Sequence, residues 1–514
     1  MTDNAVQIEN LTYFYPNREA PSLSGINLKI KQGRFIVIMG MNGSGKTTLA
    51  LSLNGIIPQL LEGRMLGKVY IEGKDTGKFR PQSLANSVGL VFQDPESQII
   101  GSTVAEDTAF GPRNLGLPPE EIEHRVQTEL AKVQLAGYEA RKTDELSGGE
   151  KQRLALAGVS AMYPKVLVLD EPASELDPEG RAALYTALDE LRREGSHTII
   201  VIEHSIEDVW NRADEVIVLK DGKVAWQGEP EKLFRNLSLL DQLGIRPLPV
   251  NGISSIGESD PWRQPCNICI QGMEKDVCQE YTGQEGDPRG RIHIRDLTHH
   301  YHSSNLSLDQ INLTIHPGEF VALIGPNGAG KTTLTKHLNG LLEPIKGDVW
   351  VSGKNTRQYK TAELAGTVGY VFQNPDHQLF ETTVEKELAF GLKNAGKSVP
   401  EIQNRVDEVL GKFGLEEYRL LHPLTLGKSL RQMLAVASAI VLQPDILVVD
   451  EPTKGLDWPG AKRVMAIIRT LHKEGTTIIM ITHDMELATH AQRVVVLNEG
   501  RIISGGNADE KNAE

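Results

Sequence analysis

Two short stretches of the sequence combine glycines, a lysine and two threonines at a spacing that suits the binding of phosphate groups. The first follows the apolar run 35–39 and contains Gly40, Asn42, Gly43, Ser44, Gly45, Lys46, Thr47 and Thr48. Glycines allow backbone N–H groups to converge on phosphate oxygens, and the helix predicted to begin here adds its positive dipole end. We expect Lys46 to reach the β- and γ-phosphates of a nucleotide and the Thr47 hydroxyl to bind Mg²⁺.

The second stretch follows the apolar run 320–324 and contains Gly325, Pro326, Asn327, Gly328, Ala329, Gly330, Lys331, Thr332 and Thr333. A plain glycine-rich turn between a strand and a helix would explain one such stretch. Two of them, each in the same context, favour a functional interpretation. The sequence therefore predicts a tandem repeat of one nucleotide-binding unit.

Each half also contains an apolar run that ends in two carboxylates. The runs are 166–169 and 446–449, and they lead into the pairs Asp170-Glu171 and Asp450-Glu451. Apolar residues on both faces indicate buried parallel strands. We expect the aspartate of each pair to hold Mg²⁺ and the glutamate to orient or deprotonate a water molecule. A solvated acidic pair at a loop start is the alternative, but it leaves the recurrence unexplained.

Other polar side chains recur at the ends of predicted strands. Gln93 and Gln373 each follow an apolar run and precede a proline by two residues, which presents the amide at a strand end. His204 and His483 also follow apolar runs. A lone histidine is more often structural, but one at the carboxyl edge of a parallel sheet lies where such sheets bind ligands, so we expect a contact with the γ-phosphate.

Tyr15 and Tyr301 precede the two phosphate-binding stretches at nearly the same distance. An aromatic ring at this place could stack on an adenine, an interaction worth ~1–3 kcal/mol. A tyrosine packed within a strand is the alternative, and the recurrence of the spacing favours stacking.

The run Ser147-Gly148-Gly149 precedes a helix predicted over 151–162 and forms a second anion-binding element by the same physics. The second half departs from it. An ungapped alignment places Gly427-Lys428-Ser429 at these positions, whereas a shift of two residues aligns 424–428 instead, also imperfectly. Either alignment predicts that the two halves form unequal sites.

The composition is that of a globular protein with several domains. Hydrophobic residues make up 39% and charged residues 24% of the 514 residues, a length that suffices for roughly two to four domains. The net charge of −14 argues against nucleic acid as a partner. We find no apolar run of about 18 residues and no basic, then apolar N-terminus, so we expect no membrane span and no secretory signal.

The order of the motifs predicts an α/β fold with two nucleotide-binding units, over 6–247 and 291–508. Residues 248–290 have no counterpart in the repeat and are rich in glycine, proline and polar residues, so we expect a linker.

The linker contains all three cysteines, Cys266, Cys269 and Cys278. This small and odd number of cysteines suggests that the protein resides in a reducing compartment and has no disulfide framework. With His293 or another histidine they could hold zinc or an iron–sulfur cluster. A reduced, exposed linker is the simpler interpretation.

Together these motifs resemble the ATP-binding cassette of transporters, over nearly all of both halves. The resemblance implies two tandem P-loop (RecA-like) domains, each with an antiparallel β-subdomain and a helical subdomain that carries the Ser-Gly-Gly signature. It implies ATP and Mg²⁺ as cofactors, with Gln93 and Gln373 among the catalytic residues and metal ligands. Cassettes of this family pair so that each ATP lies between one phosphate loop and the other cassette's signature. We therefore expect pairing within the chain, with the intact signature facing Lys331 and Glu451.

Within the family, the stretches Phe92–Gln98 and Phe372–Gln378 resemble those of energy-coupling factor (ECF) and cobalt-import ATPases. This resemblance implies uptake of a vitamin or a transition-metal ion. It also implies two membrane partners, a transmembrane scaffold subunit and a substrate-binding subunit, and a peripheral position at the cytoplasmic face of the membrane. Such importers usually have two separate ATPase chains, so the fused chain is a departure.

Two other functions stay open at this point. A two-cassette ATPase of a sugar importer has a similar length. A ribosome-associated factor also pairs two cassettes, but its linker is typically a long, charged helical pair, which residues 248–290 do not resemble.

Overall fold

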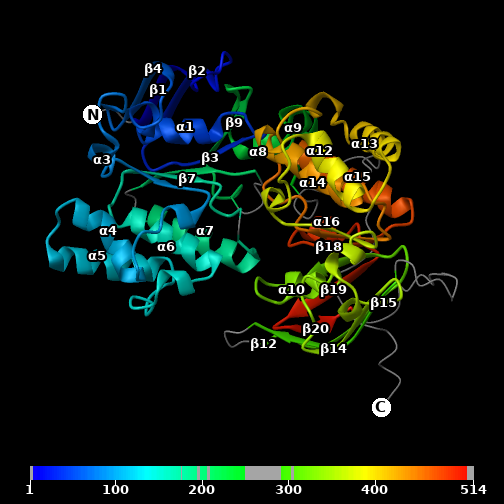
Figure 1. Cartoon of the computed structure of the whole chain (residues 1–514). Helices are drawn as coiled ribbons and strands as arrows, with labels where there is room; N and C mark the ends of the chain where they lie inside the picture. The colour runs from blue at the N-terminus through cyan, green and yellow to red at the C-terminus, as the bar shows by residue number, and fades with distance from the viewer. Residues whose placement is uncertain are drawn as a thin grey trace. The chain divides into compact units, whose positions relative to one another are not determined.

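The computed structural model describes residues 4–174, 176–193, 197–204, 209–248, 291–301 and 306–505, which form two compact units, one from each half of the chain (Figure 1). Each unit is described by itself. The predicted cysteine-containing segment 249–290 lies outside the described residues, so its interpretation as a linker or a metal site stays a prediction, as do the predicted domain bounds.

The first unit contains two sheets. The antiparallel sheet has the order β2-β1-β4-β5, and the larger sheet has the order β10-β9-β3-β8-β7-β6. In the larger sheet only β10 is antiparallel to its neighbour. The strands are β1 (Asn4–Phe14), β2 (Leu23–Lys31), β3 (Phe35–Gly40), β4 (Arg64–Ile71), β5 (Lys74–Asp75), β6 (Val88–Val91), β7 (Val166–Asp170), β8 (Thr198–Ile202), β9 (Glu215–Lys220) and β10 (Lys223–Gly228).

Three helices of the first unit, α4, α5 and α6, pack on one another and form a helical subdomain (Figure 1). The helices are α1 (Lys46–Leu53), α2 (Ile56–Gln59), α3 (Pro81–Leu84), α4 (Val104–Asn114), α5 (Pro119–Lys132), α6 (Gly148–Ser160), α7 (Pro178–Arg193), α8 (Pro230–Phe234) and α9 (Leu237–Leu243), with a 3-10 turn η1 (Pro95–Ser97).

The second unit repeats both sheets, with the orders β12-β11-β14-β15 and β16-β17-β18-β13-β19-β20. Its strands are β11 (Ile292–His300), β12 (Leu306–Ile315), β13 (Phe320–Ile324), β14 (Lys346–Val351), β15 (Lys354–Asn355), β16 (Val368–Val371), β17 (Ile446–Asp450), β18 (Thr477–Ile481), β19 (Arg493–Asn498) and β20 (Arg501–Ser504). Its helices are α10 (Lys331–Lys336), α11 (Thr361–Leu364), α12 (Val384–Asn394), α13 (Val399–Phe413), α14 (Lys428–Ile440), α15 (Trp458–Lys473) and α16 (Met485–Ala488), with a 3-10 turn η5 (Pro375–His377).

Strand β3 shows why the larger sheet is buried on both faces. All of its residues are buried, and alternate side chains enter different cores. Phe35 and Val37 belong to the core between the sheet and helices α5, α6 and α7. Ile36 and Ile38 belong to the core on the other face, with residues of β1, β2 and α1. A strand covered on both faces needs apolar residues throughout, as the sequence has here. The predicted fold class, two tandem α/β units with an antiparallel and a helical subdomain each, is confirmed.

The helix predicted over 151–162 is α6, which begins three residues earlier and ends two residues earlier. It begins at Gly148 because the Ser147 side chain caps its first turn, in a reciprocal pair of hydrogen bonds with Glu150. It ends before Tyr163, whose φ of 52° is incompatible with a continuing helix.

Candidate nucleotide site

The phosphate-binding stretch of the first unit lies between β3 and α1. The φ of Gly45 is 99°, and a Cβ on this residue would lie 2.7 Å from the carbonyl oxygen of Ser22. Glycine is therefore required where the β1–β2 turn meets the loop. The Lys46 ammonium donates to the carbonyls of Gly40 and Met41, each at 2.9 Å. Burial lowers the pKa of Lys46, and the carboxylates of Glu171 and Asp170 act in the opposite direction.

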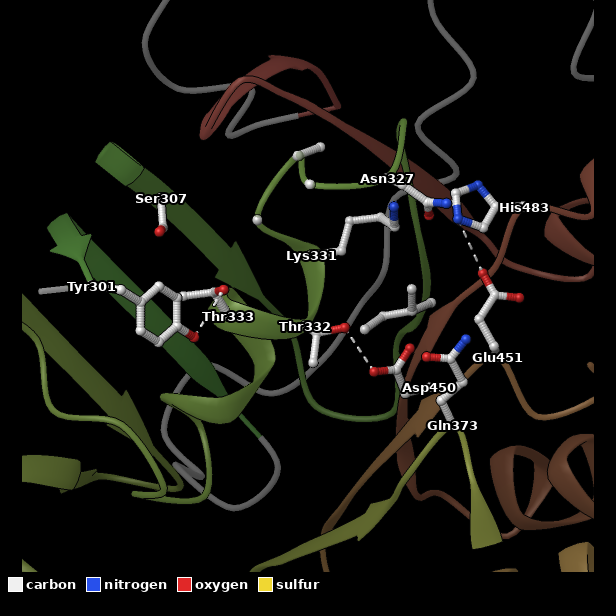
Figure 2. A pocket seen from close by; sticks show the side chains of 14 residues that line it. Tyr301, Ser307, Asn327, Lys331, Thr332, Thr333, Gln373, Asp450, Glu451 and His483 are labelled. Atoms are coloured by element: carbon white, nitrogen blue, oxygen red, sulfur yellow. Dashed lines mark hydrogen bonds and ion pairs between the residues drawn. The ribbon is translucent and has the colours of Figure 1, made fainter. Parts of the chain in front are cut away.

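The second unit has the same geometry. Lys331 donates to the carbonyls of Gly325 and Pro326 at 2.7 and 2.8 Å. Beside it lies a cavity of about 310 Å³, lined by Tyr301, Ser307, Asn327, Gly328, Ala329, Gly330, Lys331, Thr332, Thr333, Gln373, Asp450, Glu451, Ile481 and His483 (Figure 2). All of these except Ser307 and Ile481 are residues that the sequence predicts for the site.

The aspartates that end β7 and β17 lie against the threonines of the loops. Thr332 Oγ1 donates to Asp450 Oδ2 at 2.8 Å (Figure 2), and Thr47 hydrogen-bonds to Asp170 in the same way. Burial raises the pKa of both aspartates. Asp170 Oδ1 is buried and has no hydrogen-bond partner among the described residues. An unsatisfied buried carboxylate oxygen beside a threonine hydroxyl is the donor set that Mg²⁺ prefers, so these residues fit the ion.

Glu171 and Glu451 follow the aspartates in a left-handed conformation, each with a φ of 48°. Their N–H groups donate to the last residues of the neighbouring strands, Ile202 and Ile481, each at 3.0 Å. Such a conformation in a residue other than glycine is strained and is often found at functional sites.

Each glutamate lies next to the predicted histidine. His204 Nε2 is 2.7 Å from Glu171 Oε1, and Gln93 Nε2 donates to Glu171 Oε2 at 2.9 Å. In the second unit, His483 Nε2 lies 3.5 Å from Glu451 Oε1 (Figure 2). Burial raises the pKa of Glu451 to about 7, which suits a group that must accept a proton near neutral pH.

The predicted aromatic residues lie at the other end of each site. The hydroxyls of Tyr15 and Tyr301 hydrogen-bond to Thr48 and Thr333, at 3.1 and 3.3 Å (Figure 2). Because each hydroxyl is anchored at its phosphate loop, the ring position is set relative to the phosphates. Tyr301 keeps 47% of its surface exposed, which leaves room for a stacked base.

The sequence gives no signal for Ser22 and Ser307. The Ser22 hydroxyl lies 3.0 Å from Thr48 Oγ1, and Ser307 lines the cavity of the second unit. A lone serine after a turn matches no motif. Only its equivalent position in the two halves, 18 residues before Gly40 and before Gly325, could have indicated a role in the site.

The helix starts decide between the two alignments of the signature. Helix α6 begins at Gly148 after Ser147, and α14 begins at Lys428 after Gly427, so the ungapped alignment holds. Gly427 offers no side-chain cap to α14.

The Lys428 side chain packs against Gly455. A Cβ added to Gly455 would lie 3.0 Å from Lys428 Cε.

An ion pair in each unit joins the signature helix to the Gln-loop element, the stretch Phe92–Gln98 or Phe372–Gln378. Glu96 in η1 pairs with Lys151 on α6. In the second unit, Asp376 in η5 pairs with Arg431 on α14 at 2.7 Å. The same connection is thus built twice from different residues.

The last glutamine of the element holds the loop itself. Gln98 Oε1 accepts from Phe92 N at 3.1 Å, and Gln378 Oε1 accepts from Phe372 N at 3.3 Å.

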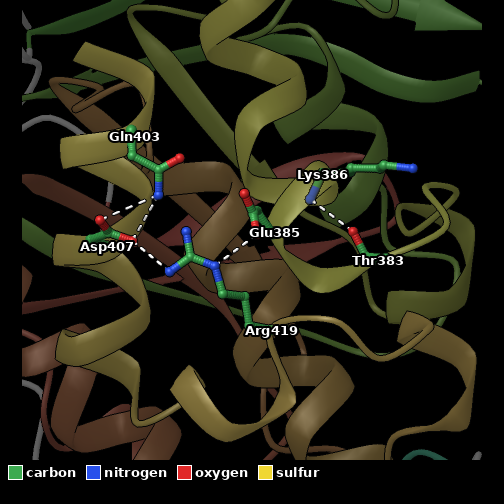
Figure 3. A network of polar contacts seen from close by, with 6 residues as sticks. All are labelled: Thr383, Glu385, Lys386, Gln403, Asp407 and Arg419. Atoms are coloured by element: carbon green, nitrogen blue, oxygen red, sulfur yellow. Dashed lines mark hydrogen bonds and ion pairs between the residues drawn. The ribbon is translucent and has the colours of Figure 1, made fainter. Parts of the chain in front are cut away.

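The loops that lead into the signature helices are held differently. In the first unit, Arg141 pairs with Glu150 of α6 at 3.3 Å. In the second unit, Arg419 binds Glu385 of α12 and Asp407 of α13, at 2.7 and 2.6 Å (Figure 3). Arg419 therefore ties the loop before α14 to α12 and α13, and Arg431 of α14 itself donates to the Leu426 carbonyl of this loop at 2.7 Å.

Comparison with known proteins agrees with this geometry. The sequence profile of the family described as ABC transporter matches residues 23–174 and 308–454, once in each unit. A protein of Methanosarcina acetivorans named as an ABC transporter ATP-binding protein is 41% identical, over 99% of this chain and 87% of the relative. A relative of the same description from Caldanaerobacter subterraneus is 38% identical, over 98% of this chain and 91% of its own length.

Among solved structures, cbiO1 from Clostridium perfringens, part of the ABC transporter complex cbiONQ, is 37% identical with a TM-score of 0.42, over 47% of this chain and 95% of that chain. The profile matches and the relatives, with the doubled site, establish the family. This chain belongs to the ABC transporter family, as an ATP-binding protein with two cassettes and ATPase activity.

Proposed function

We propose that this protein is the ATP-hydrolysing subunit of an ECF-type importer that takes up a micronutrient, either a vitamin or a transition-metal ion. The observation that carries the proposal is the doubled Gln-loop element, Phe-Gln-x-Pro-x-x-Gln, at the edge of an apolar surface in each cassette. The site chemistry is common to the whole family, so the subtype depends on this element.

In the first cassette, the element borders a groove of about 600 Å³ that Gln98, Ile100, Phe110 and Met162 help to line. Ile100 is 67% and Phe110 46% exposed. Apolar side chains gathered in a groove indicate a surface that binds a partner. The occupant that we propose is an amphipathic helix of the transmembrane scaffold subunit.

The exposed side chains are held in place rather than loose. The buried Asp107 carboxylate accepts the N–H groups of Ile100 and Gly101, at 2.8 and 2.9 Å. In the second cassette, Glu387 binds the N–H of Phe380 in the same way, at 3.0 Å. Phe380 contacts Phe390, with ring centroids 4.7 Å apart, and both rings are exposed. The repetition supports one such surface in each cassette.

In this proposal the cassettes pair within the chain, and each ATP lies between one phosphate loop and the other cassette's signature. Thr47 and Asp170, with Gln93, would hold Mg²⁺ in the first cassette, and Thr332, Asp450 and Gln373 in the second. The ion would neutralise phosphate charge when bound. Glu171 and Glu451 orient the attacking water and accept its proton.

No helix among the described residues is long and apolar enough to cross a membrane. In our proposal, attachment at the cytoplasmic face of the membrane comes from the scaffold and substrate-binding subunits.

Co-expression tests the proposal. The chain should sediment with membranes that contain the scaffold subunit and not with protein-free liposomes. Phe110→Asp together with Phe390→Asp should abolish sedimentation while ATP binding persists. Leu66→Asp, at an exposed site outside the helical subdomain, is the control. Co-purification with sugar-importer subunits or with ribosomes would instead support one of the alternatives.

A further inference from the structure

One buried carboxylate beside the first ATP site has no role in the chemistry described so far. Glu203 lies between the end of β8 and His204, and its side chain is buried with 7% of the residue exposed. A buried carboxylate is costly to desolvate unless several hydrogen bonds satisfy it. Its position therefore calls for an explanation.

Glu203 connects three separate segments of the first cassette. Its Oε1 accepts from the hydroxyl of Tyr185 on α7 at 2.9 Å and from the N–H of Ala173 at 3.3 Å. Tyr185 is itself almost fully buried. Ala173 follows Glu171 by two residues, so the carboxylate ties helix α7, the loop after Glu171 and the segment of His204 together.

Among the described residues of the second cassette, the equivalent positions do not form this connection. Thr482 stands at the position of Glu203, and Met465 at the position of Tyr185. Thr482 Oγ1 accepts from the N–H of Asp484 at 3.0 Å, within its own loop, and Met465 has no hydroxyl to donate.

The two cassettes also differ in the pair that this connection surrounds. The histidine nitrogen is 2.7 Å from the glutamate oxygen in the first cassette and 3.5 Å away in the second. The shorter distance occurs in the cassette that has the buried carboxylate.

We propose that Glu203, together with Tyr185, is a positioning residue for the Glu171–His204 pair of the first cassette. Glu203 acts by fixing the two segments that carry these side chains. What matters is the length of the Glu203 side chain and the position of its acceptor oxygen, rather than its charge. The second cassette, with threonine and methionine, holds its pair less closely.

The test separates the two sites by working in two backgrounds of the full chain. With Glu451→Gln, the remaining ATP hydrolysis reports the site of Glu171, and with Glu171→Gln it reports the site of Glu451. Glu203→Thr copies the second cassette and should lower kcat roughly tenfold in the first background. This is less than the ~10²-fold that a misplacement of about 1 Å can cost. KM for ATP should stay within about twofold, because Glu203 does not touch the nucleotide.

Glu203→Gln is the conservative variant. Its amide oxygen can accept the hydrogen bonds from Tyr185 and Ala173, so kcat should recover to within about twofold of the parent. In the Glu171→Gln background, neither substitution should change kcat. An equal loss in both backgrounds would overturn the proposal, as would an unchanged kcat for Glu203→Thr or a loss with Glu203→Gln as large as with Glu203→Thr.

Tyr185→Phe keeps the test decisive if Glu203→Thr fails to fold. It removes the hydrogen bond to Glu203 Oε1 without a change in charge or a large change in volume. We expect a smaller loss of kcat, about threefold, only in the Glu451→Gln background. The reciprocal double variant, Thr482→Glu with Met465→Tyr, should raise kcat in the Glu171→Gln background. The proposal would be contradicted if this double variant gave no gain and Tyr185→Phe gave no loss.

Discussion

At the scale of single residues, the two ATP sites have the same side chains at the positions that we propose to be catalytic, and they differ in the signature that we propose to face each of them. Ser147 caps α6, whereas Gly427 provides no side chain and Lys428 adds a long one. A flexible lysine does not replace fixed N–H donors at a developing charge.

Glu451→Gln should therefore lower ATP turnover by at least ~10²-fold, the loss expected for a positioned base. Glu171→Gln should cost less, because its site faces the altered signature in our proposal. Lys331→Ala should likewise reduce turnover more than Lys46→Ala. Steady-state hydrolysis of the four variants checks this, and equal losses within each pair would show that the signature does not set the asymmetry.

Restoring the signature should strengthen the weaker site. Gly427→Ser with Lys428→Gly and Ser429→Gly supplies the N-cap and the small residues of the first cassette. In a Glu451→Gln background we expect hydrolysis to rise about tenfold, which is less than the ~10²–10³-fold that one preorganised donor can contribute. Ser147→Gly is the matched control, and it should not lower hydrolysis in this background, where the second signature faces the active site.

At the scale of elements, each cassette links its Gln-loop turn to its signature helix by an ion pair. Arg431→Glu sets two like charges against each other at Asp376 and should lower hydrolysis several-fold. The free energy of unfolding should change by less than about 1 kcal/mol, because partly exposed pairs stabilise proteins only weakly. The double variant with Asp376→Arg should restore hydrolysis. If it does not, the helix start depends on Arg431 for another reason, such as its bond to the Leu426 carbonyl.

Much of this architecture was predictable from sequence, because it depends on local patterns. Strand β3 is apolar throughout and is followed by glycines, so both the strand and the loop were expected. The start of α6 was placed too late, because glycines disfavour a helix interior and only the Ser147–Glu150 capping pair explains their place in the first turn.

Contacts between distant segments could not be predicted. The bond from Tyr185 to Glu203 joins a helix to a strand end, and no spacing in the sequence indicates it. The same holds for Ser22 against Thr48. Such pairs are set by packing of the completed sheet rather than by the residues next to them in the chain.

At the scale of the whole molecule, the two cassettes should respond differently to acid. His337 follows α10 and is fully buried, with Nδ1 2.7 Å from the Thr333 carbonyl and the His299 ring 4.8 Å away. Burial lowers the pKa of His337 from 6.5 to about 4. Between these values the unfolded chain binds a proton that the folded cassette excludes, so stability falls as the pH falls through this window.

His337→Ser copies Ser52, the residue at this position in the first cassette, and isolates the effect. Relative to this variant, the native second cassette should lose ~3 kcal/mol of unfolding free energy between pH 7 and pH 4, at about 1.4 kcal/mol per pKa unit. Urea unfolding across this range measures the difference. A difference that is independent of pH would mean that His337 titrates normally in the folded protein.

The presence of both cassettes on one chain has a consequence for assembly. When two modules are joined covalently, their encounter has a fixed effective concentration, often in the millimolar range. Dilution then cannot separate them. The ATPase rate per chain should stay constant down to nanomolar protein, whereas cleavage within residues 249–290 should make the rate fall with dilution. Fusion also fixes the ratio of the two sites, which we expect to be unequal, at one to one in every complex. Two separate chains would have to be synthesised in equal amounts to reach the same ratio.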